Sequence, residues 1–176
     1  MRLDVHRREA EAGPPPSAVR TGTLVVGLGS PHGDDRIGWL VAEEIARRTR
    51  DDVAVRCLTL PVDVCTEMQG FERVVIIDAC RMSDPIGAAR RWTWPAPEIR
   101  LLRASGTHAI GLPESLALAE RIGGLPPEVV VWGVSARNFA PQSELAEALL
   151  SAVPDVADRI LMQDICVPSS GGPVDA

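Results

Sequence analysis

The chain has 176 residues, a hydrophobic content of 45%, a charged content of 24% and a formal net charge of −6. These values are typical of one globular domain with enough chain to bury a core. They exclude nucleic acid as a partner, because the chain has no basic stripe. They also exclude a membrane span, because no apolar run approaches the ~20 residues that it requires.

The two ends of the chain differ in composition from its middle. Residues 1–21 mix charged residues with Ala, Gly and three consecutive prolines, and the chain ends in VPSSGGPVDA. Such segments bury little apolar surface, so we expect flexible ends at 1–21 and 163–176 around a single domain at 22–162. The N-terminal end lacks the apolar region of a secretory signal, which predicts a cytoplasmic protein.

Three strands and two helices are predicted in the first half. Residues 23–28, TLVVGL, predict a strand buried on both faces, followed by a glycine-rich acidic loop. An amphipathic helix of about 14 residues comes next, with an inward face of Ile37, Leu40, Val41 and Ile45. Residues 53–59 alternate as a second strand, a shorter helix runs to Gly70, and residues 73–78, RVVIID, predict a third, buried strand.

The second half continues the same alternation. Residues 89–94 predict a strand that places Trp92 and Trp94 on one face, and the prolines after it indicate a sheet edge. A loop at 100–111 precedes a helix opened by proline, with a buried stripe of Leu112, Leu116, Ala119 and Ile122. Residues 128–134 predict the last strand. Ser143 is then expected to cap a final helix, with inward-facing Leu145, Ala148, Leu149 and Ala152.

Strands that alternate with helices in this way predict a doubly wound α/β fold. We expect a mostly parallel sheet of about five strands with helices on both faces, in a single domain. The four cysteines contain no CxxC pair, so we expect reduced thiols, with Cys57 and Cys80 buried in or just after strands.

Polar residues collect where the predicted strands end. Asp34 and Asp35 follow the first strand, Asp78 ends the third, and His108 precedes a helix. All of them would lie at the carboxyl edge of the sheet, where open α/β sheets hold their ligands. Two carboxylates and a neutral imidazole suit a divalent ion such as nickel or zinc.

Each of these residues also has a structural alternative. Asp34 is well placed to cap the following helix while Asp35 points elsewhere. Asp78 would be partly desolvated, which favours a cation or donors, but it can also cap a loop or pair with Arg81. His108 can be a surface residue, and solvent exposure is expected for His32.

Four motifs, GLGSPHGDDRIG, VVIIDACR, SGTHAIGL and VVVWGV, resemble those of the hydrogenase maturation proteases. These endopeptidases trim the C-terminal extension from the large subunit of nickel–iron hydrogenases. The resemblance covers residues 24–160 and implies a doubly wound α/β fold. It also implies that Asp35, Asp78 and His108 are the catalytic and metal-binding residues.

The resemblance further implies the ligand and the partner. The metal would be the nickel already installed in the large-subunit precursor, with zinc or cadmium able to replace it in crystals. We expect a monomer that clamps the flexible tail of that precursor.

The chain departs from the family pattern at several positions. Ser30 replaces an asparagine, Arg36 a glycine, Pro61 a turn glycine, and Ser135-Ala136 a Glu-Pro-like pair. Arg36 could pair with an acid of the site or point outward. Arg36 and Ser30 motivate the alternative of a non-catalytic docking protein for a hydrogenase subunit.

A nucleotide-binding domain is the other alternative, and it is disfavoured. Gly33 falls one residue late for the GxGxxG pattern, and the two aspartates would face a pyrophosphate.

Overall fold

The computed structural model describes residues 22–49, 53–101 and 111–166. It contains a five-stranded sheet in the order β2-β1-β3-β5-β4, in which β1, β2, β3 and β5 run parallel and β4 pairs antiparallel with β5. The strands are β1 (Thr23–Leu28), β2 (Val53–Leu58), β3 (Arg73–Cys80), β4 (Ala89–Thr93) and β5 (Glu128–Ser135). The predicted fold class is confirmed, and so is the edge position of the strand that precedes the prolines.

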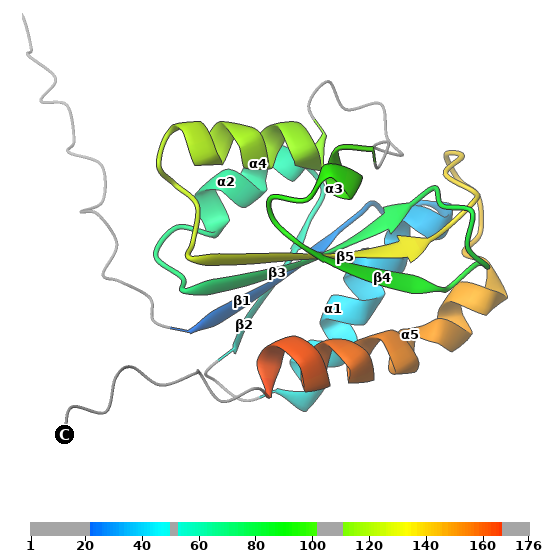
Figure 1. The fold of residues 1–176 in the computed structure, drawn as a ribbon. Helices are drawn as coiled ribbons and strands as arrows, with labels where there is room; N and C mark the ends of the chain where they lie inside the picture. The colour runs from blue at the N-terminus through cyan, green and yellow to red at the C-terminus, as the bar shows by residue number, and fades with distance from the viewer. Residues whose placement is uncertain (1–21, 50–52, 102–110, 167–176) are drawn as a thin grey trace, which may run out of the picture.

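Helices cover both faces of the sheet (Figure 1). One face carries α1 (Ile37–Arg48) and α5 (Glu147–Ile160), which continues into the π-helix η3 (Leu161–Ile165). The other face carries α2 (Val64–Glu67), α3 (Pro97–Leu101) and α4 (Leu112–Arg121). In the part of the chain that the structure describes, no helix has the length and apolar character of a membrane span.

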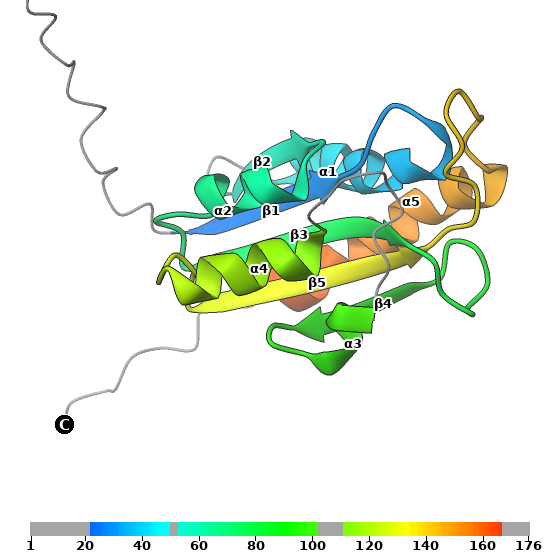
Figure 2. The same cartoon turned by 90° about the horizontal axis from the view of Figure 1, so that it is seen from above.

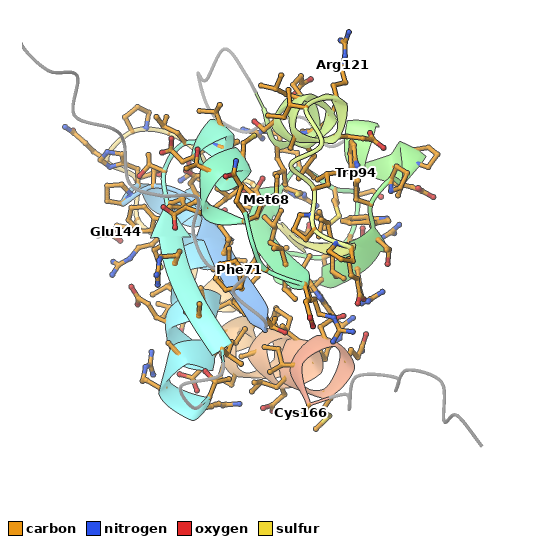
Figure 3. The ribbon with its side chains drawn as sticks, turned by 90° about the vertical axis from the view of Figure 1, so that its left-hand side faces the viewer. Met68, Phe71, Trp94, Arg121, Glu144 and Cys166 are labelled. Carbon is orange, nitrogen blue, oxygen red and sulfur yellow. The ribbon has the colours of Figure 1, made fainter. Side chains whose placement is uncertain are left out.

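The alternation of side chains along β3 divides the core between these two layers. Val75 and Ile77 belong to the cluster under α1 and α5, whereas Val74 and Ile76 belong to the cluster under α2 and α4. Met68 and Trp94 lie in this second cluster, while Arg121 extends away from α4 (Figure 3). Since successive residues of a strand point to opposite faces, Asp78 faces the α2 and α4 side.

The loops after β1, β3 and β5 lie together at one end of the sheet (Figure 2). The 3-10 helix η1 (Gly33–Arg36) belongs to the first of them, and the 3-10 helix η2 (Pro61–Asp63) follows β2. Asp78 pairs in register with Gly133, and β3 continues to Cys80, so the prediction that Asp78 ends its strand is wrong by two residues.

Several predicted side-chain positions are also wrong. The final helix begins at Glu147 after Ala146, and Ser143 donates to the carbonyl of Ala140 instead of capping it. This later start changes the inward face, so Ala148 is exposed. The buried residues of α5 are Leu149, Val153, Val156, Ala157 and Ile160.

Other differences arise at helix ends and sheet edges. Ile122 follows the last turn of α4 and is 64% exposed, so it is outside the predicted stripe. Cys57 is exposed because β2 is an edge strand, whereas Cys80 on a central strand is buried as expected. The segment predicted as a loop from residue 100 begins inside α3.

The folded body also extends past the expected boundary at residue 162. Residues 161–165 form η3, in which Asp164 is buried. The expectations for residues 1–21 and 167–176 fall outside the described residues.

Candidate functional site

The acidic loop after β1 turns at Gly33, whose φ of 53° lies in the left-handed region that favours glycine. A Cβ added at Gly33 would overlap the side chain of Ser143, and it would lie 2.6 Å from the carbonyl oxygen of Asn138. The Gly33 amide donates to the Ser143 carbonyl at 2.9 Å. Glycine at this position therefore allows the loop to pack directly on the segment that follows β5.

Asp34 is the buried acid of the pair, with 1% of its surface exposed. Its carboxylate accepts backbone hydrogen bonds from Arg137 at 2.9 Å, Asn138 at 2.8 Å and Ala146 at 3.0 Å. The predicted role as a cap of α1 is wrong, because the N-cap residue of that helix is Arg36 and it has no side-chain cap. Asp34 instead satisfies amides of a distant loop and of the start of α5.

Asp35 is partly buried and belongs to the same short helix, η1. Its charge acts on Asp78, since the pKa of the Asp78 carboxyl is raised to about 7, first by burial and then by repulsion from Asp35. A hydrogen bond from the Ala79 amide opposes this rise. The structure thus brings two of the three predicted site residues into electrostatic contact.

No arginine in the described residues forms an ion pair with this carboxylate pair. Arg36 is exposed on η1, which supports its predicted outward position. Arg81 donates to the carbonyl of Arg137 at 3.0 Å and lies over the ring of Phe139 at 4.7 Å. The alternative in which Arg81 neutralises Asp78 is therefore not observed.

His108 lies outside the described residues, in the segment that connects α3 to α4. Those two helices cover the face of the sheet toward which Asp78 points. The described ranges hold no group of three His, Cys, Asp or Glu side chains that could bind a metal. His32 is exposed, as expected.

The chemistry of this pair follows from two like charges near one another. One carboxylate retains a proton near neutral pH, since charging both in a partly desolvated site is unfavourable. A divalent cation that approached would displace this proton and be held by oxygen ligands, with positions left for an imidazole and for the substrate.

The sequence did not predict how the roles of the two adjacent acids differ, with Asp34 accepting backbone hydrogen bonds and the charge of Asp35 acting on Asp78. It also missed Arg137, whose guanidinium donates to carbonyl oxygens of the loop after β3. The only sequence signal was the acidic pair itself, and no local pattern indicates which acid is buried or where its partners are.

The family model and three of the solved structures that match this chain belong to the same protein family. The family model described as hydrogenase maturation protease matches residues 40–163, a range that includes Asp78 and His108 and begins after Asp35. No curated protein matches the sequence significantly.

Solved structures match most of the chain. The hydrogenase maturating endopeptidase HybD from E. coli is 19% identical with a TM-score of 0.68, covering 80% of this chain and 90% of that one. The hydrogenase 2 maturation peptidase from Thaumarchaeota archaeon SCGC_AB-539-E09 is 28% identical with a TM-score of 0.61, covering 80% and 96%. The maturation protease HycI from Thermococcus kodakarensis KOD1 is 22% identical with a TM-score of 0.64, covering 80% and 90%.

Proposed function

Because the chain belongs to the hydrogenase maturation protease family, we propose that it is the endopeptidase that removes the C-terminal extension of a nickel–iron hydrogenase large subunit. The substrate is the precursor in which nickel has already been installed, and the nickel is the feature that the enzyme recognises. Asp35, Asp78 and His108 are the residues proposed to contact this ion.

The observation that carries this proposal is the carboxylate pair at the carboxyl edge of the sheet. Burial, and then repulsion from Asp35, raise the pKa of Asp78, and no arginine of the described residues is paired with either acid. A purely structural acid in such a place would have a basic partner or several donors, as Asp34 has. The unneutralised pair is suited to a cation that arrives with the substrate.

The roles proposed for the residues follow from their chemistry. Asp35 and Asp78 provide anionic oxygen ligands, and His108 provides a neutral nitrogen ligand. When the ion binds, Asp78 releases the proton that it holds in the free enzyme, so recognition of the precursor is coupled to proton release. The nickel then fixes the precursor against the loops after β1 and β3.

The docking alternative depended mainly on Arg36, which was a potential partner for the acids. Its exposed position and lack of an ion pair to either acid in the described residues remove that reason for inactivity. The endopeptidase is therefore the function that the geometry favours.

The test is cleavage of the nickel-loaded precursor, followed as a size shift on a gel under reducing, anaerobic conditions. Asp35→Asn, Asp78→Asn and His108→Ala should each lower the rate at least about 100-fold, the upper range for loss of a group that supports a metal contact. His32→Ala is the matched control, because this imidazole is exposed in the same acidic loop, and it should retain activity. Full activity in any of the three site variants would remove that residue from the site.

Binding and cleavage must be measured together. Wild-type protein that binds the precursor but does not shorten it would contradict the endopeptidase proposal and favour the docking function. Crystals soaked with nickel, zinc or cadmium should hold the ion between Asp35, Asp78 and His108. An ion elsewhere would contradict the assignment of these ligands.

A further inference from the structure

We infer that Asp34 and Arg137 are positioning residues, which together hold the loop carrying Asp35 at a fixed place relative to Asp78. This inference rests on the proposed function, because it concerns the same site. It assigns a role to Arg137, which the sequence patterns leave without one, and it replaces the helix-capping role that the sequence predicts for Asp34.

The backbone pairing of the sheet does not reach Asp35. The register between β1 and β3 ends with Gly27 opposite Ile77, one residue before Asp78. Asp35 lies beyond this last pair and beyond the turn at Gly33. Its position therefore depends on what holds η1.

Asp34 provides this hold. Its carboxylate accepts the amides of Arg137, Asn138 and Ala146, and its own amide donates to the Asn138 carbonyl at 2.9 Å. A carboxylate that is 1% exposed has no water to replace these donors, so the geometry of η1 is tied to the loop after β5. Asp35, the next residue, moves with it.

Arg137 connects the same loop to the segment that follows Asp78. Its guanidinium donates to the carbonyl of Met82, and to that of Asp84 at 2.7 Å. Arg81 donates back to the Arg137 carbonyl at 3.0 Å. One residue thus binds Asp34 through its backbone and the loop after β3 through its side chain.

This bridge opposes a specific force. Asp35 and Asp78 repel each other in the absence of a cation when both are charged, and movement of the loop that carries Asp35 would relieve this repulsion, as uptake of a proton by Asp78 does. A hydrogen-bonded bridge between the two loops keeps the carboxylates close before the ion arrives. Pre-organisation of this kind increases affinity because binding need not order the ligands.

The test uses the full metal-free chain and zinc ions alone, with affinity measured by calorimetry well below the unfolding temperature. Asp34→Asn keeps the shape of the side chain but removes one acceptor oxygen, and Arg137→Gln removes the guanidinium. Each should weaken zinc binding about 10-fold to 100-fold, the range for loss of a group that orients a ligand. Amide hydrogen exchange should accelerate at Arg137, Asn138 and Ala146 in Asp34→Asn.

Matched controls separate positioning from stability. Asp164 is also 1% exposed and bonded to several donors, but it lies in η3, beside Arg73 at the start of β3. Asp164→Asn should lower stability and leave zinc affinity unchanged. Arg159→Gln matches Arg137→Gln, because Arg159 also donates to a backbone carbonyl, that of Ala89, and it too should leave the affinity unchanged.

The outcomes are distinct. Unchanged zinc affinity in both Asp34→Asn and Arg137→Gln would overturn the positioning inference and leave the proposed function intact. A loss of zinc affinity in Asp164→Asn as large as that in Asp34→Asn would have the same consequence. If Asp34→Asn does not fold, Arg137→Gln decides, because its side chain is largely exposed. Wild-type protein that neither binds zinc nor cleaves the precursor would overturn the proposed function itself, and the inference with it.

Discussion

The raised pKa of Asp78 predicts that the stability of the metal-free protein depends on pH. The carboxyl has a pKa of about 7 in the folded chain, against 3.8 as the ordinary value. The folded state therefore holds the Asp78 proton more tightly than the unfolded state does. This contribution to stability is complete below about pH 4 and is lost as the pH rises through about 7.

The size of the effect follows from the size of the shift. A shift of about three pH units corresponds to an upper limit of about 4 kcal/mol, at about 1.4 kcal/mol per unit. Between about pH 5 and about pH 8, the range easiest to measure, the limit is about 2.6 kcal/mol. Because the side chain is only partly buried, we expect about half of this limit in practice.

The assay compares wild type with Asp78→Asn by urea denaturation in the presence of a chelator. Asparagine has nearly the same shape and no charge, so the variant should not share the loss of stability that wild type shows as the pH rises. The free energy of unfolding of the variant, relative to that of wild type, should therefore increase by about 1–2 kcal/mol between about pH 5 and about pH 8. Asp63→Asn, which changes an exposed carboxylate of η2, should follow the wild-type curve. Parallel curves for wild type and Asp78→Asn would refute the argument that burial and Asp35 hold a proton on Asp78.

Asp35→Asn provides a second check on the cause. Burial is the larger cause of the shift and Asp35 the smaller one. Removal of the Asp35 charge should therefore lower the pKa of Asp78 without returning it to the ordinary value. Carbon NMR of the Asp78 carboxyl would measure this directly.

Two further predictions concern stability away from the site. Asp164→Asn should cost about 2–4 kcal/mol in urea denaturation, because it weakens a buried ion pair with Arg91; a cost below about 1 kcal/mol would contradict this. Gly38→Ala should cost about 2 kcal/mol or more, since its Cβ would overlap the Leu28 carbonyl where α1 packs on the sheet. Gly124→Ala, whose nearest new contact is 3.7 Å, should stay within about 0.5 kcal/mol of wild type; equal losses in both variants would contradict the packing argument.

The sequence by itself determined the order of the elements. Continuous apolar runs such as RVVIID and EVVVWGV predict strands that are covered on both faces. Because the segments between them have helical periodicity, the sequence predicts a parallel sheet with helices on both sides. The expectation that Asp35 and Asp78 lie at one edge of the sheet followed from this order, because parallel strands bring their carboxyl ends to one edge.

Only the tertiary structure decided what each acid does. Asp34 and Asp35 are adjacent and chemically identical, yet Asp34 is buried because its hydrogen-bond donors come from residues more than 100 positions later in the chain. Periodicity describes how a segment faces its own neighbours and contains no information on such distant partners. The later start of α5 has the same origin, since the Ala146 amide is held by Asp34 rather than by a local cap.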